Sequence, residues 1–194
     1  DRHLAERGGQ KALLWISTEV DQTRSFTYRE LHAEVNRAAA MLHALGVKRG
    51  DRVIVYMPMI PEACFAILAC ARIGAIHSVV FGGFAAASLA ARIDDAKPTL
   101  MITADGGSRM GKAVLYKLAQ HPPRKVLIFR RGLDANMPVV AGRDVGWAEL
   151  AAKYKGASVP CAWLESNEPS YILYTSGTTG KPKGVQRDVG GYAV

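Results

Sequence analysis

Short apolar runs alternate with longer helical segments through the middle of this chain, and this alternation constrains the fold more than any other feature. The run Val53-Ile54-Val55-Tyr56 has no charged position, which is typical of a strand covered on both faces. After it, Pro61 and Glu62 suit the first turn of a helix. We expect that helix to run to about Ile73 and to end at Gly74.

The same alternation continues toward the C-terminus. It predicts further strands over residues 75–81, 99–103, 125–129 and 170–174. It predicts helices over residues 85–96, 111–120 and 147–154. Strands separated by helices need crossover connections, which favour parallel pairing. The sequence therefore predicts an α/β fold, with a layered, mostly parallel sheet and helices on both faces.

An earlier helix is predicted over residues 26–46. Thr27 and Glu30 form a capping-box pattern, in which a hydroxyl and a carboxylate satisfy the unpaired amides of the first turn. Apolar residues then recur at spacings of three and four and form one stripe, made by Leu31, Val35, Ala38, Leu42 and Leu45. Gly46 follows as the expected C-cap.

Composition excludes several classes of protein. The 194 residues carry a formal net charge of +8, which suits an anionic partner such as nucleotide phosphates, nucleic acid or acidic lipid. No RNA-binding signature supports nucleic acid, and the longest apolar run, residues 63–71, is far below the roughly 20 residues of a membrane helix. The three cysteines, Cys64, Cys70 and Cys161, give no disulfide framework and indicate buried, reduced thiols in the cytoplasm.

Isolated polar and aromatic residues offer weaker candidates. The five histidines, His3, His32, His43, His77 and His121, have no metal-ligand spacing, so no metal site is predicted. His77 is expected at the edge of the core. The three tryptophans, Trp15, Trp147 and Trp163, are interpreted as packing residues. Asp94 and Asp95 are adjacent on a predicted helix, point in different directions and are expected to be solvated.

The segment 174–184 carries the strongest chemical signal. It holds three glycines, four Ser or Thr hydroxyls and two lysines directly after a predicted strand. Glycines let backbone amides approach a phosphate, hydroxyls donate to its oxygens or meet Mg²⁺, and lysines neutralise its charge. We therefore predict a triphosphate-binding loop formed by Thr175, Ser176, Gly177, Thr178, Thr179, Gly180, Lys181 and Lys183.

Two better-known loops do not fit this segment. The P-loop motif needs GxxxxGK[ST], whereas Gly177 and Gly180 are too close together and Pro182 follows Lys181. The hydrolase elbow needs GxSxG, and Tyr174 stands where its first glycine would be. The remaining alternative is a surface loop that is merely rich in Thr and Gly.

The order of residues in this loop resembles the signature T-S-G-[TS]-T-G-x-P-K-G of the adenylate-forming superfamily, which includes acyl-CoA synthetases. Residues 175–184 match every fixed position. The resemblance implies that this loop holds the β- and γ-phosphates of ATP, with Mg²⁺. Residues 57–62 and 71–84 are similar to the short-chain acyl-CoA synthetases in particular, and Arg187-Asp188 resembles their propionate-activating group.

Two further segments are implied to meet coenzyme A. Gly82 and Gly83 lie in a turn that is near the coenzyme in this family, although a strand-to-helix turn needs glycine in any case. Residues 104–112 resemble a stretch that ends R-G-G-K and binds the nucleotide end of the coenzyme. The resemblance therefore implies coenzyme contacts from Arg109, Met110, Gly111 and Lys112, where Met110 replaces the usual glycine. The alternative for Arg109 and Lys112 is an ordinary solvated helix start.

Taken together, the resemblance implies a ligase that activates a short carboxylate, with propionate favoured. The carboxylate attacks the α-phosphate of ATP, and the thiol of coenzyme A then displaces AMP from the acyl-adenylate. Residues 1–194 would be part of the N-terminal adenylation domain, ending just after the phosphate loop and lacking the mobile C-terminal domain. No catalytic residue can be assigned, so the piece alone is expected to be inactive.

Several alternatives stay open at this point. They are an acetyl-CoA synthetase, another short-chain acyl-activating enzyme, and a nucleotide-binding module without catalysis. The expected partners are small molecules, with neither nucleic acid nor membrane among them. Apolar surface left exposed by an incomplete domain would favour homo-oligomers.

Overall fold

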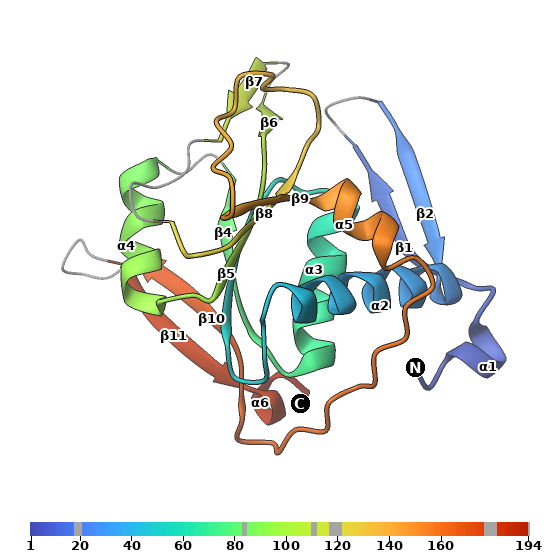
Figure 1. Cartoon of the computed structure of the whole chain (residues 1–194). Helices are drawn as coiled ribbons and strands as arrows, with labels where there is room; N and C mark the ends of the chain where they lie inside the picture. Colours follow the sequence, from blue (N-terminus) through green and yellow to red (C-terminus); the bar gives the residue numbers. More distant parts are fainter. Residues whose placement is uncertain (18–20, 83–84, 110–111, 117–121, 177–181, 194) are drawn as a thin grey trace.

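A seven-stranded sheet forms the centre of the computed structural model, which describes residues 1–17, 21–82, 85–109, 112–116, 122–176 and 182–193 (Figure 1). Its strands are β3 (Arg52–Met57), β4 (Ile76–Phe81), β5 (Leu100–Ala104), β8 (Val126–Phe129), β9 (Asp144–Gly146), β10 (Pro169–Ser176) and β11 (Pro182–Asp188). The spatial order is β11-β10-β4-β3-β5-β8-β9. The pairs are parallel except for β10 with β11, which confirms the predicted mostly parallel sheet.

The strand order explains why helices cover both faces. From the central strand β3 the chain passes through α3 (Pro61–Ile73) to β4 on one side. It then passes through α4 (Ala86–Ala96) to β5 on the other side of β3. Since such crossovers are right-handed, two crossovers in opposite directions place their helices on opposite faces. Figure 1 shows α3 and α4 on the two sides of the sheet, as predicted.

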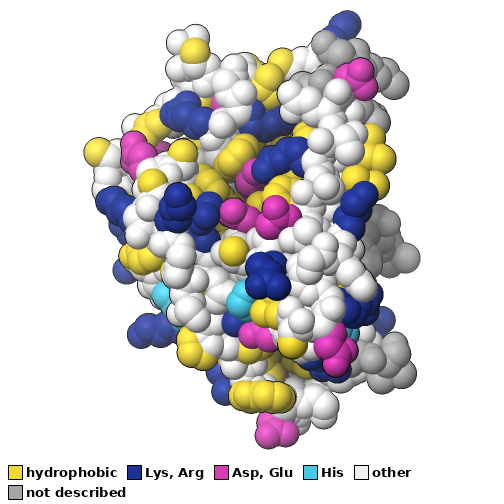
Figure 2. Space-filling view, turned by 90° about the vertical axis from the view of Figure 1, so that its right-hand side faces the viewer, with side chains coloured by type: hydrophobic (Ala, Val, Ile, Leu, Met, Phe, Trp, Pro, Cys, Tyr) yellow, Lys and Arg dark blue, Asp and Glu magenta, His cyan; other side chains and the backbone are white. Residues whose placement is uncertain are grey.

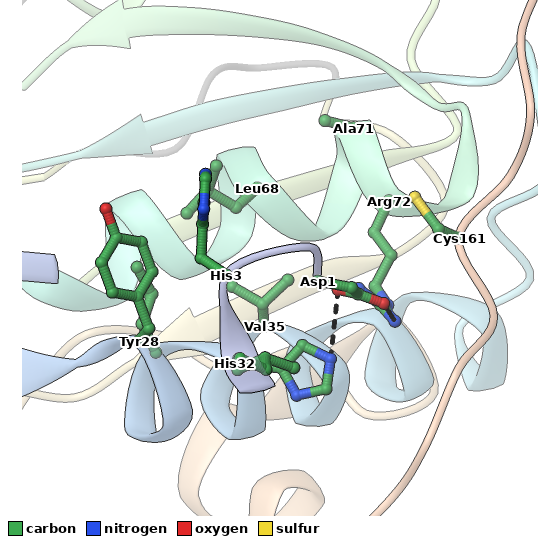
Figure 3. Close-up of a pocket in the computed structure, with 11 residues that line it drawn as sticks. Asp1, His3, Tyr28, His32, Val35, Leu68, Ala71, Arg72 and Cys161 are labelled. Carbon is green, nitrogen blue, oxygen red and sulfur yellow. Dashed lines mark hydrogen bonds and ion pairs between the residues drawn. The ribbon is translucent and has the colours of Figure 1, made fainter. Parts of the chain in front are cut away.

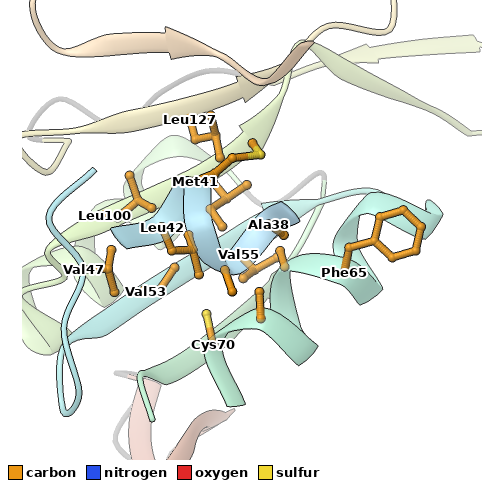
Figure 4. Packing of buried hydrophobic residues seen from close by; sticks show 14 of the residues in the cluster. Ala38, Met41, Leu42, Val47, Val53, Val55, Phe65, Cys70, Leu100 and Leu127 are labelled. Atoms are coloured by element: carbon orange, nitrogen blue, oxygen red, sulfur yellow. The ribbon is translucent and has the colours of Figure 1, made fainter. Parts of the chain in front are cut away.

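Alternation along β3 divides the core into two layers. Val53, Val55 and Met57 pack with α3 and with two further helices, α2 (Tyr28–Ala44) and α5 (Trp147–Lys153). Figure 4 shows Met41 and Leu42 of α2 and Cys70 of α3 around Val53 and Val55. Ile54 and Tyr56 point to the opposite face and pack with α4.

The helix ends follow their sequence signals. In α2 the amide of Glu30 donates to the Thr27 hydroxyl at 3.2 Å, and the Glu30 carboxylate accepts from the Thr27 amide at 2.8 Å. Gly46, one residue after the C-cap of α2, has a φ of +89°. Gly74 ends α3 with a φ of +71°. Both glycines occupy the left-handed region that L side chains avoid.

The helix predicted over residues 111–120 is contradicted over the part that the structure describes. Its described part, 112–116, begins with β7 (Lys112–Leu115), which pairs with β6 (Gly106–Arg109) as an antiparallel hairpin. Val114 is half-buried and Tyr116 buried, whereas Lys112, Ala113 and Leu115 are exposed. From Ala113 to Tyr116 the burial has a period of two, which is the period of a strand and not of a helix. Residues 117–121, including His121, lie outside the described part of the chain.

Several elements carry no strong sequence signal. A hairpin of β1 (Lys11–Ile16) and β2 (Thr23–Thr27) packs beside α2, and the Trp15 indole donates to the Met59 carbonyl at 2.7 Å. The short helices α1 (Leu4–Arg7) and α6 (Val189–Ala193) and the edge strands β9 and β11 were also not predicted. The addition of β11 means that the glycine-rich segment connects two antiparallel strands.

One part of the sheet exposes apolar side chains. On the face that carries α3, Val79 and Phe81 of β4 are 44% and 61% exposed. Leu173 of β10 and its cross-strand neighbour Val185 are 49% and 40% exposed. The exposed apolar surface expected from the sequence therefore lies over β4, β10 and β11, beyond the edge of α3.

Other side-chain environments correct the expectations. Trp147 is buried, but Trp163 is 93% exposed and is not a packing residue in this chain. Cys70 is buried, and burial raises the pKa of its thiol to about 12. Cys64 is half-buried and Cys161 exposed, so buried thiols were predicted correctly only for Cys70.

Charged side chains of both signs lie on one face of the molecule. On the face that Figure 2 shows, Lys and Arg side chains are interspersed with Asp and Glu side chains. The net charge of +8 therefore does not form a single basic region on that face. Among the described helices, none is both long and apolar enough to cross a membrane.

Replacing Gly74 with Ala should destabilise the fold more than replacing Gly46 with Ala. Both changes put a side chain into left-handed backbone, at a cost of about 1–2 kcal/mol. At Gly74 the new Cβ would also lie 3.0 Å from Leu164 Cδ2 and 3.1 Å from Arg49 Cγ, whereas Gly46 has open space. We expect an additional loss of about 1 kcal/mol at Gly74, measured by urea denaturation. Equal losses at the two sites would contradict this packing argument.

Candidate functional site

The three sequence-predicted segments meet at one edge of the sheet. Gly82 follows β4, the β6–β7 hairpin follows β5, and the phosphate-loop segment follows β10. Because β4, β5 and β10 run parallel within one sheet, their carboxyl ends share an edge. In open α/β sheets ligands bind at this edge, next to the point where the strand order reverses. Here that point lies between β3 and β5, and the β6–β7 hairpin rises directly beside it.

The stems of the phosphate loop are held together by a strand ladder. Thr175 pairs with Lys183, and Ser176 pairs with Pro182. Thr175 and Lys183 are exposed, so a hydroxyl and an ammonium stand at the two ends of the loop. The candidates between them, Gly177, Thr178, Thr179, Gly180 and Lys181, lie outside the described residues.

The residue before the loop makes a contact that the sequence did not reveal. The Tyr174 hydroxyl donates to Asp95 Oδ2 at 2.6 Å, and the Arg92 guanidinium lies 5.4 Å from the centre of the Tyr174 ring. Burial, this hydrogen bond and the Asp95 charge together raise the pKa of Tyr174. Asp95 is exposed, as expected, and its carboxylate also accepts this hydrogen bond from a strand 79 residues away. Asp94 is exposed, as expected.

Gly82 has a role inside the protein. A Cβ at Gly82 would lie 1.7 Å from the Tyr116 hydroxyl oxygen, and a Cβ at Gly107 would lie 2.9 Å from the same atom. Tyr116 is only 4% exposed and packs on Tyr56 with ring centroids 4.7 Å apart. Because the two glycines have no side chains, the Tyr116 ring can pack against both Gly82 after β4 and Gly107 of the β6–β7 hairpin.

The basic candidates lie at the tip of this hairpin. Arg109 pairs with Lys112 across the two strands, and the Lys112 side chain is exposed. The alternative of a solvated helix start is therefore wrong. Gly83, Met110 and Gly111 lie outside the described residues, so the structure places only the neighbours of these three candidates.

Asp105 anchors the base of the hairpin. Its side chain is fully buried, and its carboxylate accepts hydrogen bonds from the amides of Arg131, Gly132 and Leu133 at 2.9, 2.9 and 3.1 Å. The Arg131 guanidinium also donates to the Gly106 carbonyl at 3.1 Å. These three amide donors satisfy the oxygens of the buried carboxylate. Asp105 thus fixes the hairpin relative to the segment after β8, a role that its sequence position alone did not indicate.

A cavity of about 330 Å³ opens beside the exposed apolar face. Its lining is mainly apolar and includes His77, Tyr171, Leu173 and Tyr192. The His77 ring stacks on Tyr171 with centroids 5.7 Å apart, and burial lowers the pKa of His77 to about 4. Its Nδ1 is buried and has no hydrogen-bond partner among the described residues. His77 is thus a neutral wall residue near pH 7, at the core edge where it was expected.

A second cavity, of about 310 Å³, lies between α1, α2 and α3 (Figure 3). Arg72 donates to both carboxylate oxygens of Asp1, at 2.7 and 2.9 Å, and to the Val159 carbonyl at 2.6 Å. His32 Nε2 lies 3.2 Å from Asp1 Oδ1. Burial and the Arg72 charge lower the pKa of His32, so we treat this ring as neutral near pH 7 and not as a second cation. The Arg72 guanidinium, which lines this cavity, is therefore already paired with groups of this chain.

Metal-binding clusters are not found in the part of the chain that the structure describes: no three His, Cys, Asp or Glu side chains converge there. The described donors at the phosphate loop are the Thr175 hydroxyl and the Lys183 ammonium. Their chemistry suits the anionic oxygens of a nucleotide, whose phosphates could themselves carry Mg²⁺.

The chain belongs to the family described as "AMP-binding enzyme", whose sequence model matches residues 1–193. It is 62% identical to a propionate–CoA ligase of Escherichia coli and 64% identical to one of Salmonella typhimurium, in both cases over the whole of this chain. An acetyl-coenzyme A synthetase of Parvibaculum lavamentivorans is 52% identical over the whole chain. The chain spans about a third of the length of these relatives, 31–32%.

Replacing Gly82 with Ala should displace Tyr116 and destabilise the chain by about 1–3 kcal/mol, the usual cost of overpacking. The new Cβ would overlap the Tyr116 hydroxyl, so in a Tyr116→Ala background the same glycine change should cost much less. A double-mutant cycle of urea-unfolding free energies measures this coupling. Gly9→Ala serves as the control, because a Cβ there meets nothing within 4 Å. Additive losses would refute the proposed contact.

The low pKa of His77 should make stability depend on pH. The unfolded chain takes up a proton near pH 6.5, whereas the folded chain resists protonation of His77 down to about pH 4. The contribution of His77 to the free energy of unfolding is therefore fully present above pH 6.5 and is lost as the pH falls toward 4. His77→Phe keeps a ring against Tyr171 and should flatten this part of the stability curve, measured by denaturant unfolding at pH 7, 5.5 and 4.5. Parallel curves for the two proteins would contradict the assignment.

Proposed function

We propose that this chain is part of the N-terminal adenylation domain of a short-chain acyl-CoA synthetase that uses ATP, Mg²⁺ and coenzyme A. The observation that carries the proposal is the phosphate-loop segment, with matching sequence, between two paired strands at the carboxyl edge of a parallel sheet. Membership of the AMP-binding family and the names of the relatives support the same chemistry. Propionate is the favoured carboxylate because two of the relatives are propionate–CoA ligases.

The reaction has two steps. A carboxylate oxygen attacks the α-phosphorus of ATP, the bond to the β-phosphate oxygen breaks, and pyrophosphate leaves. The thiol of coenzyme A then attacks the acyl carbon, loses its proton and displaces AMP. A free carboxylate is a poor acyl donor, and adenylation gives it a good leaving group. Mg²⁺, when bound, neutralises phosphate charge.

In the first step the loop residues bind and orient the phosphates. The ladder between Thr175 and Lys183 brings the Thr175 hydroxyl and the Lys183 ammonium to the two ends of the loop. Gly177 and Gly180 would let backbone amides approach the departing pyrophosphate, and Ser176, Thr178, Thr179 and Lys181 would add donors. Such fixed donors lower the barrier because they need no reorganisation as charge develops.

In the second step the β6–β7 hairpin would bind the nucleotide end of coenzyme A. Arg109 and Lys112 stand at its tip, where their charges can pair with phosphate oxygens. Met110 and Gly111, which lie between them in the sequence, are proposed as further coenzyme contacts. Gly82 and Gly83 would supply further coenzyme contacts, and Gly82 also makes room for Tyr116.

The catalytic machinery is completed outside these 194 residues in this proposal. Residues 1–194 supply the phosphate loop and the coenzyme hairpin, and the rest of the adenylation domain and a mobile C-terminal domain supply the other groups. We therefore infer that the isolated chain has no ligase activity and that it self-associates through the apolar face over β4, β10 and β11. ATP and coenzyme A are intracellular metabolites, so we infer a cytoplasmic reaction.

The test is a pyrophosphate-exchange assay on the complete gene product that carries this sequence. We expect ATP-dependent exchange with propionate, followed by acyl-CoA formation when coenzyme A is added. Lys183→Ala should raise KM for ATP roughly tenfold, because a charge-assisted contact to phosphate is lost. Lys112→Ala should raise KM for coenzyme A and leave the exchange reaction unchanged.

Lys11→Ala, an exposed lysine on β1, is the control and should change neither constant. A preference for acetate or butyrate over propionate would keep the ligase and correct the substrate. Absence of exchange with all three carboxylates would overturn the proposed function.

A further inference from the structure

The phosphate-loop hairpin is attached to α4 by a contact just before the loop begins. Tyr174 is the last residue before the predicted phosphate-binding positions, and its hydroxyl donates to Asp95 near the C-terminus of α4 at 2.6 Å. The Arg92 guanidinium, one helical turn earlier, lies over the same ring at 5.4 Å. One side chain of β10 is thus held by a hydrogen bond and by a cation–π contact.

The contact includes the second stem of the loop. Gly184 of β11 stands directly opposite Tyr174 in the ladder. A Cβ at Gly184 would lie 3.1 Å from Tyr174 Cε1 and 3.2 Å from Asp95 Oδ2. The Tyr174 ring and the Asp95 carboxylate therefore both lie against the backbone of β11, where a side chain would crowd them. Residues before and after the loop are held against the same point on α4.

The helix is a firm support for this contact. Leu89 is fully buried and Ile93 is 5% exposed, and both pack in the core layer between α4 and the sheet. Arg92 is itself fixed, since its guanidinium donates to the Ser88 carbonyl at 2.7 Å and to the Ser88 hydroxyl at 2.6 Å. A strand end attached to such a helix keeps a fixed position relative to the other loops at the carboxyl edge.

We propose that Tyr174 and Asp95 are positioning residues for ATP: by clamping Tyr174 and Gly184, which lie before and after the phosphate-binding positions, onto α4, they fix the two ends of the loop before the nucleotide arrives. The proposal rests on the proposed function, because it assigns the loop to ATP phosphates. Loop ends that are already fixed lose less conformational entropy on binding, so the clamp contributes to affinity without touching the ligand. The raised pKa of Tyr174 keeps its hydroxyl protonated, and thus a donor, through the neutral and mildly alkaline range.

The complete gene product is compared with three variants in the ATP–pyrophosphate exchange assay. Tyr174→Phe removes the hydroxyl and keeps the ring over Gly184, Asp95→Ala removes the acceptor, and the third variant combines them. Each single change should raise KM for ATP roughly fivefold to tenfold, the net effect of one ordinary hydrogen bond. Turnover and KM for coenzyme A should stay within about twofold, since the clamp acts on the loop and not on the reacting atoms. The double variant should be no worse than either single one.

Two matched changes separate positioning from general stability. Asp94→Ala removes the neighbouring exposed carboxylate on the same helix and should leave KM for ATP unchanged. Asp95→Asn keeps an acceptor oxygen and should restore most of the affinity. The proposal is overturned if KM for ATP is unchanged in Tyr174→Phe, if the single effects add, or if Asp94→Ala has the same effect as Asp95→Ala.

Amide hydrogen exchange tests the clamp without any assay of activity. Residues 182–188 should exchange faster in Tyr174→Phe and Asp95→Ala than in the unaltered protein or in Asp94→Ala. If the unaltered protein shows no pyrophosphate exchange but this protection pattern holds, the proposed function fails and the clamp stands. If protection of residues 182–188 is the same in all of these proteins, the clamp itself is refuted.

Discussion

Burial of β3 on both faces is the constraint on which the rest of the structure depends. A strand without charged positions between Val53 and Met57 needs an apolar layer on each side, and its alternating side chains divide the core between α2 and α3 on one face and α4 on the other. Because the chain leaves β3 for β4 on one side and returns for β5 on the other, right-handed crossovers supply one helix to each face. The same reversal creates the candidate binding edge between β3 and β5.

Glycines of the candidate site make room for the protein's own aromatic rings. Gly82 and Gly107 accommodate Tyr116, which itself stacks on Tyr56 of β3. Gly184 accommodates Tyr174 and the carboxylate that binds it. In both places a glycine next to a predicted ligand-binding segment lets a tyrosine join that segment to the layered core. The described ends of the segments at the carboxyl edge are in this way joined to the core by packing.

Buried charges in this chain tie segments that are distant in sequence. Asp105 accepts three backbone amides from residues 131–133, which replaces the water that the carboxylate loses on burial. Arg72, 9% exposed, is paired with Asp1 and with the carbonyl of Val159. Separating such a buried group from its partners would leave an uncompensated charge. These residues therefore stabilise one arrangement of the loops over others.

The sequence by itself determined the elements whose signals are local. The cap at Thr27, the start of α3 at Pro61 and its end at Gly74 follow from side-chain and backbone preferences within a few residues. The order of the phosphate-loop residues likewise identified the candidate site. Only the tertiary structure decided that residues 112–115 form a strand, that β11 closes the loop into a hairpin, and that Asp95 meets Tyr174. These outcomes depend on partners far away along the chain, and no local pattern records which partner a strand edge or a carboxylate will find.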